Sequence, residues 1–171
     1  MKKVIVTGGL GFIGSNLIEL LIEDGFKVIN IDKITYSSNN YNVKEFKHSK
    51  NYKFIKCDIG NKKLKKIIFK YKPICIFNLA AETHVDRSID GPGEFVKSNI
   101  NGVFNLLEAF RNYYKLFKKT KLIHISTDEV YGDILKGRCT ETWPYKPSSP
   151  YAASKASSDH IVFSYFRTFN L

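Results

Sequence analysis

Short apolar segments alternate with helical patterns along the whole chain, and this alternation limits the folds that the sequence can adopt. The apolar segments are the length of buried strands, and the segments between them repeat apolar residues at helical spacing. Such strand-helix-strand units form right-handed crossovers and a parallel sheet. We therefore predict a doubly wound α/β fold, with strands at residues 4–6, 26–31, 52–57, 73–79 and 121–126, one helix between Gly14 and Gly25, and further helices at 62–71, 95–115 and 150–169.

The expected strand order is 3-2-1-4-5, and in such sheets ligands bind beyond the carboxyl ends of the strands at the switch point between the first and fourth strands. Two long segments without regular patterning, residues 33–51 and 131–149, are rich in Asn, Ser, Gly and Pro. Loops of this length are often functional.

The chain has 171 residues, of which 43% are apolar, enough for one domain spanning residues 1–171. No apolar run approaches the roughly 18 residues that cross a bilayer, and the N-terminus has no signal-peptide pattern, so a cytoplasmic protein is expected. Cys57, Cys75 and Cys139 lie outside any zinc-ligand spacing, so neither a metal site nor a disulfide is expected.

Basic residues outnumber acidic ones, 27 to 16, giving a net charge of +11. Only four of them are arginines, and lysine is the poorer residue for reading base edges. The densest lysine run, residues 62–66, fits the solvated face of a helix whose Leu64, Ile67 and Ile68 point inward. We therefore expect no specific nucleic-acid partner.

Three glycines, Gly8, Gly11 and Gly14, are spaced Gly-x-x-Gly-x-x-Gly between the first strand and the first helix. This spacing allows a tight turn, close approach of the backbone to a pyrophosphate, and a helix N-terminus facing the phosphates. Asp32 ends the next strand, where a carboxylate accepts hydrogen bonds from an adenosine ribose and repels a 2'-phosphate. The pattern predicts NAD rather than NADP, although the neighbouring Lys33 softens that repulsion.

Tyr151 and Lys155 are four residues apart, on one face of the last helix. A cation close to a phenol lowers its pKa, so that the phenolate can take a proton from a hydroxyl group. Together with a hydride acceptor, this pair predicts oxidation of an alcohol.

Four segments now resemble the extended short-chain dehydrogenase/reductases, and among them the nucleotide-sugar 4,6-dehydratases of the NAD-dependent epimerase/dehydratase family. They are Thr7–Asn16, Asp32–Tyr36, Ala80–Ser88 and Ser126–Asp133. Related epimerases keep the glycines and the Tyr/Lys pair but usually lack an acid pair after Thr127, so Asp128 and Glu129 are the discriminating residues. The resemblance implies a Rossmann-like fold.

The resemblance also implies catalytic roles for Thr127, Asp128, Glu129, Tyr151 and Lys155. Tyr151 would take the proton of the sugar 4-hydroxyl, oriented by Thr127, while NAD accepts the hydride from C4. Glu129 would then remove the C5 proton and Asp128 would protonate the departing 6-hydroxyl, before C6 is reduced. The implied reaction converts dTDP-glucose to dTDP-4-keto-6-deoxyglucose, with UDP and CDP left open as the nucleotide.

By the same resemblance, Thr83 and Thr127 should touch the sugar, and the residues that should contact NAD are Gly8, Gly11, Phe12, Ile13, Gly14, Asp32, Lys33, Ile34, Thr35, Asp58, Ile59, Leu79, Ala80, Ala81, Thr83, Asn99, Tyr151 and Lys155.

Members of the family are about twice this length and carry a smaller C-terminal domain that holds much of the substrate. We therefore expect this chain to correspond to their N-terminal half and to have weak or no dehydratase activity, since positioning supplies on the order of 7 to 11 kcal/mol of a barrier. The resemblance implies a homodimer paired through two long helices. Two alternatives stay open, a non-catalytic NAD-binding remnant and an epimerase or decarboxylase acting on UDP-sugars.

Overall fold

The structure is a computed structural model that describes residues 1–171, and the chain divides into two compact units. The first unit contains residues 1–80 and 105–125, and the second contains residues 81–104 and 126–171. Each unit is described by itself below, and the expectation of one domain stays a prediction.

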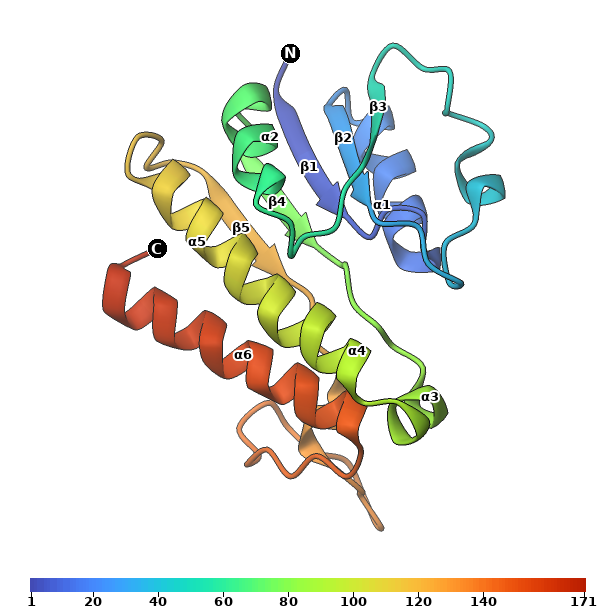
Figure 1. Ribbon diagram of the computed structural model, residues 1–171, viewed down its shortest axis with the longest axis vertical. Coiled ribbons are helices and arrows are strands. Elements are labelled where there is room, and N and C mark those ends of the chain that lie inside the picture. Colours follow the sequence, from blue (N-terminus) through green and yellow to red (C-terminus); the bar gives the residue numbers. More distant parts are fainter. The chain divides into compact units, whose positions relative to one another are not determined.

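The first unit contains a sheet of five parallel strands in the order β3-β2-β1-β4-β5 (Figure 1). This confirms the predicted doubly wound α/β fold and its strand order. Each strand is within about two residues of its expected bounds: β1 (Lys3–Thr7), β2 (Lys27–Asp32), β3 (Tyr52–Lys56), β4 (Cys75–Asn78) and β5 (Lys121–His124).

Both faces of the central strand are buried, because side chains alternate along a strand. Val4 and Val6 of β1 join one apolar cluster with Ile18 and Leu21 of helix α1 (Phe12–Glu23). On the opposite face, Ile5 is fully buried. Its register partners, Ile29 of β2 and Ile76 of β4, are equally buried. Continuous burial of β1 explains why its sequence is apolar throughout.

Helices α2 (Lys63–Tyr71) and α5 (Val103–Tyr114) each present an apolar face inside the first unit. Leu64 and Ile68 of α2 are fully buried, and the surrounding lysines are exposed, as the sequence predicted. The rings of Phe69 and Tyr113 meet edge to face, with 5.5 Å between their centroids, and join α2 to α5.

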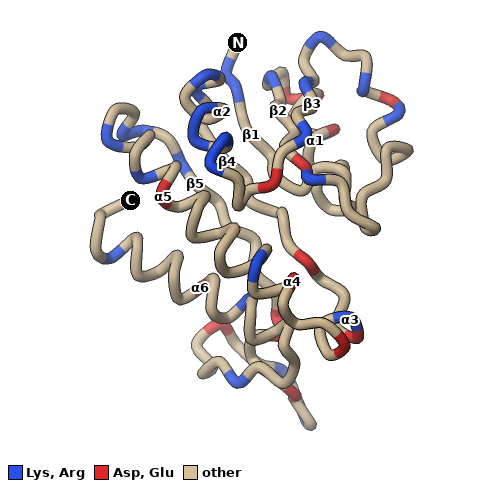
Figure 2. Tube along the Cα trace, in the orientation of Figure 1, with Lys and Arg blue, Asp and Glu red and all other residues tan.

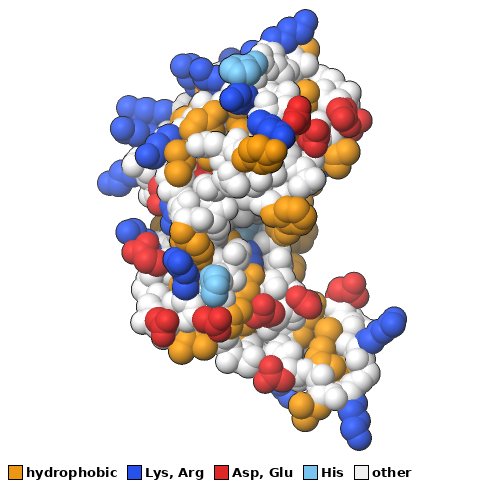
Figure 3. Space-filling view, turned by 90° about the vertical axis from the view of Figure 1, so that its right-hand side faces the viewer, with side chains coloured by type: hydrophobic (Ala, Val, Ile, Leu, Met, Phe, Trp, Pro, Cys, Tyr) orange, Lys and Arg blue, Asp and Glu red, His pale blue; other side chains and the backbone are white.

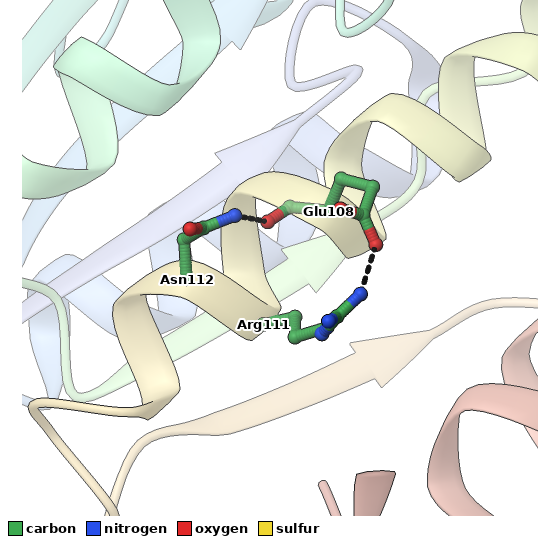
Figure 4. A network of polar contacts seen from close by, with 3 residues as sticks. All are labelled: Glu108, Arg111 and Asn112. Atoms are coloured by element: carbon green, nitrogen blue, oxygen red, sulfur yellow. Dashed lines mark hydrogen bonds and ion pairs between the residues drawn. The ribbon is translucent and has the colours of Figure 1, made fainter. Parts of the chain in front are cut away.

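Helix α5 carries a short polar network (Figure 4). Arg111 Nη1 donates to Glu108 Oε1 at 3.0 Å, and Asn112 Nδ2 donates to the backbone oxygen of Glu108 at 2.7 Å. An ion pair between side chains three residues apart supports a helix by about 0.2–0.5 kcal/mol. This network therefore adds modestly to the helical preference of α5.

The second unit is built around α6 (Pro150–Phe169). Ser149 caps this helix by accepting a hydrogen bond from the backbone nitrogen of Ala152 at 3.0 Å, and Pro150 begins it, as predicted. Four segments pack against α6: α3 (Val85–Asp90), α4 (Gly93–Phe95), the π-helical segment Val96–Gly102 and the 3-10 helix Asp128–Tyr131.

The expectation of one regular helix over residues 95–115 is therefore only partly right. Residues Val96–Gly102 are wound as a π-helix between α4 and α5. The middle of this segment is fixed by Asn99, which is buried and hydrogen-bonded to a chain segment 17 residues away. Wide turns of this kind often occur at functional sites.

Lysine and arginine are concentrated in the first unit (Figure 2), and blue side chains crowd the upper part of the face in Figure 3. The first unit has 20 basic and 7 acidic residues, a net charge of +13, whereas the second has 7 basic and 9 acidic residues, a net charge of −2. Helix α2 alone contains four lysines. No helix of the chain combines the length and the apolar character needed to cross a membrane.

Candidate functional site

The glycine turn between β1 and α1 leaves no space for side chains. Gly8 has a positive φ of +71°, and a Cβ atom on it would lie 2.8 Å from the backbone nitrogen of Ala80. A Cβ atom on Gly14 would lie 2.4 Å from the carbonyl oxygen of Gly8. The turn therefore requires glycine for its own packing, independently of any ligand.

The N-terminus of α1 has the character of an anion-binding site. Its N-cap is Gly11, which provides no side-chain cap, and no acidic residue occupies the first turn. The next two side chains, Phe12 and Ile13, are 81% and 62% exposed. Free backbone N–H groups, partial positive charge and open apolar surface together fit the pyrophosphate and adjoining part of a dinucleotide.

Asp32, at the end of β2, is 6% exposed and accepts three hydrogen bonds. Its Oδ2 accepts from the backbone nitrogen of Leu10 at 3.1 Å. Its Oδ1 accepts from the backbone nitrogen of Ile34 at 2.8 Å and from Ser38 Oγ at 3.0 Å. A carboxylate has about four acceptor positions, so Oδ2 retains one for a ribose hydroxyl. These three donors fix the orientation of the Asp32 carboxylate beside the glycine turn.

Ile34 has a left-handed backbone, with φ of 63°, although its side chain is β-branched. This conformation is unfavourable for such a residue by on the order of 1–2 kcal/mol. The bond from its nitrogen to Asp32 holds it in place. Strain of this kind clusters at ligand sites, and no pattern in the sequence indicated it.

A chain of hydrogen bonds joins the carboxyl ends of three strands in the first unit. Thr7 Oγ1 donates to Asn78 Oδ1 at 2.6 Å, and Asn78 Nδ2 pairs with His124 Nδ1 at 2.9 Å. The backbone nitrogen of Ala80 donates to Thr7 Oγ1 at 3.3 Å. Sequence reasoning missed this array, which fixes the path of residues 79–80 beyond β4.

Of the remaining predicted cofactor residues in the first unit, Asp58 turns the chain after β3, where its Oδ1 accepts from the backbone nitrogen of Gly60 at 2.7 Å. Ile59 beside it is 5% exposed. Lys33, Thr35 and Leu79 are half-buried.

In the second unit, the Asn99 side chain is held by hydrogen bonds to two other chain segments. Its Nδ2 donates to the backbone oxygen of Glu82 at 2.9 Å and to Ser154 Oγ at 2.8 Å, and its Oδ1 accepts from the nitrogen of Glu82 at 2.9 Å. Both amide hydrogens are thus used within the protein. Its contact with NAD stays a prediction, as do those of Ala81, which is half-buried, and Thr83, which is exposed.

Tyr151 and Lys155 lie one turn apart on α6 and are 7% and 5% exposed. Ser88 Oγ accepts from the backbone nitrogen of Tyr151 at 3.0 Å, and the ring of Phe95 packs edge-on against the phenol. A hydrogen bond joins the side chains of Tyr151 and Thr127. The second unit thus brings together three of the five predicted catalytic residues on one side of α6.

The surroundings of Tyr151 in this unit disfavour the phenolate form of its side chain. Burial raises the pKa of the Tyr151 phenol, the hydrogen bond with Thr127 lowers it, and the carboxylates of Glu129 and Asp128 raise it again. Burial lowers the pKa of the Lys155 ammonium, while Asp159 raises it. The lowering of the Tyr151 pKa toward neutrality stays a prediction, and it requires positive charge close to the phenol.

Asp128 and Glu129 occupy a one-turn 3-10 helix, Asp128–Tyr131, and both are exposed. Thr127 Oγ1 caps this helix by accepting from the nitrogen of Glu129 at 3.3 Å, and it contacts Asp128 Oδ1 at 3.4 Å. The acid pair and the Tyr151 phenol are therefore linked through one threonine hydroxyl. Such a grouping provides candidates for both a proton acceptor and a proton donor.

The residues that sequence reasoning missed in this unit are Asp159 and Tyr145. Asp159 is 5% exposed and lies one helical turn beyond Lys155. The spacing of four residues after the Tyr/Lys pair was the available signal.

A family model described as GDP-mannose 4,6 dehydratase matches residues 5–171. A dTDP-glucose 4,6-dehydratase from Haemophilus influenzae is 48% identical over 100% of this chain and 53% of its own length. The crystal structure of the dTDP-glucose 4,6-dehydratase DesIV from Streptomyces venezuelae with NAD bound has a TM-score of 0.91 and 37% identity, covering 99% of this chain and 53% of that one.

A UDP-glucose 4-epimerase from Thermus thermophilus in complex with NAD is also similar, with a TM-score of 0.87 and 35% identity over 99% of this chain and 52% of that one. The chain thus spans about half the length of the relatives it matches. Since the family model covers nearly every residue, the chain belongs to the GDP-mannose 4,6-dehydratase family.

Proposed function

We propose that this chain provides the cofactor-binding and acid-base parts of an NAD-dependent nucleotide-sugar 4,6-dehydratase acting on dTDP-glucose, a hydro-lyase. The observation that supports this proposal most is the acid pair, Asp128 and Glu129, on a helix capped by Thr127. The Thr127 side chain is also hydrogen-bonded to Tyr151. An alcohol oxidation alone needs the tyrosine, whereas removal of water also needs an acid and a base. The cytoplasm is the compartment we propose for this reaction.

The start of α1 fits a dinucleotide, because its N-cap Gly11 provides no side-chain cap and no acidic residue occupies the first turn. Gly11, Phe12 and Ile13 would hold its pyrophosphate end, and Asp32 its adenosine ribose. The negative charge of Asp32 favours NAD over NADP. NAD held there would supply a reversible hydride acceptor for C4 and C6 of the sugar.

The chain's own residues would move the protons. Tyr151 removes the proton of the 4-hydroxyl, with Lys155 stabilising the phenolate and Thr127 orienting the hydroxyl. Glu129 removes the proton at C5, made acidic by the C4 ketone, and Asp128 protonates the 6-hydroxyl, which leaves as water. The net change is loss of one water molecule without net oxidation.

Nuclear magnetic resonance of the product tests this function. The chain is incubated with NAD and dTDP-glucose in deuterium oxide, and we expect a 4-keto-6-deoxy sugar with deuterium at C5. Glu129→Gln and Asp128→Asn should abolish the product. A 4-epimer formed without loss of water would contradict the dehydratase and support the epimerase.

The epimerase remains a second candidate because of the likeness to the Thermus thermophilus enzyme. A non-catalytic NAD-binding role is the third candidate. Calorimetric binding of NAD without any sugar conversion by the chain would favour it.

We also propose that the chain forms a homodimer through its long helices α5 and α6. Phe163 and Phe166 of α6 are 57% and 59% exposed, and Phe104 near the start of α5 is 51% exposed. Aromatic rings with this much exposure are typical of surfaces that a partner covers.

A further inference from the structure

Asp159 is a buried carboxylate on α6 to which the proposed reaction assigns no role. It is 5% exposed, one helical turn from Lys155 and two turns from Tyr151. The three side chains therefore follow one another along the buried side of the same helix, in the order phenol, ammonium and carboxylate.

Two side chains from outside α6 hold this carboxylate. Ser126 Oγ donates to Asp159 Oδ2, and the hydroxyl of Tyr145 donates to the same oxygen at 3.1 Å. The ring of Tyr145 is itself in contact with the rings of Tyr131 and His160, with centroid distances of 5.4 and 5.3 Å. A carboxylate held by two hydroxyl donors is fixed in position.

Two consecutive residues, Ser126 and Thr127, contact the same face of α6 at two places. Ser126 contacts Asp159, and Thr127 contacts Tyr151, eight residues earlier on α6. Lys155 lies midway between these two contacts in the helix. The segment that carries Asp128 and Glu129 is thus attached to α6 on both sides of Lys155.

We propose that Asp159 is a positioning residue for the reaction, whose carboxylate, held by Ser126 and Tyr145, keeps the buried Lys155 protonated on the helix face of Tyr151. The proposal rests on the proposed function for its catalytic consequence, but its electrostatic part does not. A buried ammonium without a nearby anion tends to lose its proton, and a neutral lysine cannot stabilise a phenolate. The Asp159 carboxylate raises the pKa of Lys155, which burial lowers.

Other titratable groups around this face have different effects. Asp128 and Glu129 raise the pKa of the Tyr151 phenol, and Tyr131 raises that of Tyr145. His160 contacts the Tyr145 ring. Among these groups, Asp159 alone is a carboxylate one turn from Lys155 on the same helix.

Titration of Lys155 in the chain, labelled with carbon-13 at lysine Cε, tests the proposal without any turnover. The Lys155 resonance is assigned by its loss in Lys155→Arg. In Asp159→Asn we expect the pKa of Lys155 to fall by about one unit, as for loss of a nearby opposite charge. Asp159→Glu should restore most of it, and Asp133→Asn, which removes an exposed carboxylate of the same unit, should leave it unchanged. An unchanged Lys155 pKa in Asp159→Asn overturns the proposal.

Asp159→Asn keeps the shape of the side chain, yet it can fail to fold. In that case the double variant Lys155→Met/Asp159→Asn should be more stable than Asp159→Asn alone, because the uncompensated ammonium is then absent. Failure of the second substitution to recover any stability contradicts the proposal. If the chain turns over dTDP-glucose, the alkaline limb of the pH profile should move to lower pH in Asp159→Asn. An absence of turnover in every form counts against the proposed function and leaves the Lys155 titration as the deciding result.

Discussion

Gly8 lies so close to Ala80 that a Cβ atom on Gly8 would stand 2.8 Å from the backbone nitrogen of Ala80. The obstacle is backbone, which cannot rotate away as a side chain does. Gly11 donates its backbone N–H to the carbonyl oxygen of Gly8 at 3.2 Å, and α1 begins at the next residue. The close approach of the chain beyond β4 and the geometry of the phosphate turn therefore depend on the same glycine.

We expect Gly8→Ala to lower the free energy of unfolding by at least about 2 kcal/mol, because it combines a strained φ with a backbone clash. NAD binding should be lost in parallel. Gly25→Ala is the matched control, since Gly25 has a similar φ of +81° but no atom near its added Cβ. It should lower stability by only about 1 kcal/mol. Urea unfolding and calorimetry with NAD measure both effects, and equal losses in the two variants would contradict the clash.

A substitution at Ile34, by contrast, should stabilise the fold. Replacing it by Asn, which tolerates a left-handed backbone, should raise the free energy of unfolding by about 1 kcal/mol. Ile34→Val keeps the β-branched side chain and should bring no such gain. The same urea experiment compares them. A gain in both variants would show that side-chain size, rather than the φ of 63°, is responsible.

Asp32 should control the choice of nucleotide. In Asp32→Asn the negative charge is lost, so the ratio of NAD to NADP affinity should fall, mainly through tighter NADP binding. Stability should fall by about 1–3 kcal/mol, because three donors lose their charged acceptor. Calorimetric titration with both nucleotides measures the ratio, for which Asp24→Asn, at an exposed carboxylate just after α1, is the control. A ratio unchanged by Asp32→Asn would remove this residue from ribose recognition.

The Tyr145 phenol should make stability depend on alkaline pH. Burial, followed by the nearby Asp159 carboxylate, raises the pKa of Tyr145 to about 12. The unfolded chain loses this proton near pH 10 and the folded chain only near pH 12, so the free energy of unfolding should fall between these values. Tyr145→Phe should flatten that part of the curve. Tyr131→Phe leaves the hydrogen bond from Tyr145 to Asp159 in place and removes only the smallest of the effects that raise the Tyr145 pKa, so most of the slope should stay.

Phe166→Glu should convert the proposed homodimer to a monomer, because the ring is 59% exposed and charge at a paired apolar surface is costly. Light scattering after size-exclusion chromatography measures the mass. Leu135→Glu, at a residue that is 94% exposed on the loop before α6, should leave the mass unchanged. A monomer before any substitution would contradict pairing through these helices.

The sequence allowed the strand order, the glycine turn and the Ser149–Pro150 helix start to be predicted, because each depends on neighbouring residues or on a periodic pattern. The strand ends were less accurate. Ile125 still donates to Asn78, but β4 ends there, so β5 has no further partner. A strand's length is set by its neighbour, which no single segment encodes.

The features that could not be predicted join residues far apart in the chain. Thr7 and His124 meet through Asn78, and the wide helical turn is fixed by Asn99, which bonds Ser154. The backbone of Ile34 violates the ordinary preference of its own residue type, so propensity argues against the observed state. A spacing argument could have identified Asp159 as the counter-ion of Lys155. The two hydroxyl groups that donate to Asp159 come from segments outside α6, so the sequence did not indicate them.

The uneven distribution of lysine has a practical consequence for handling the protein. With +13 in one unit and −2 in the other, the positive charge at neutral pH belongs to one part of the chain rather than to all of it. The protein should adhere to a cation-exchange column by its lysine-rich unit alone, and elute at higher salt than a protein whose +11 is spread over its whole surface.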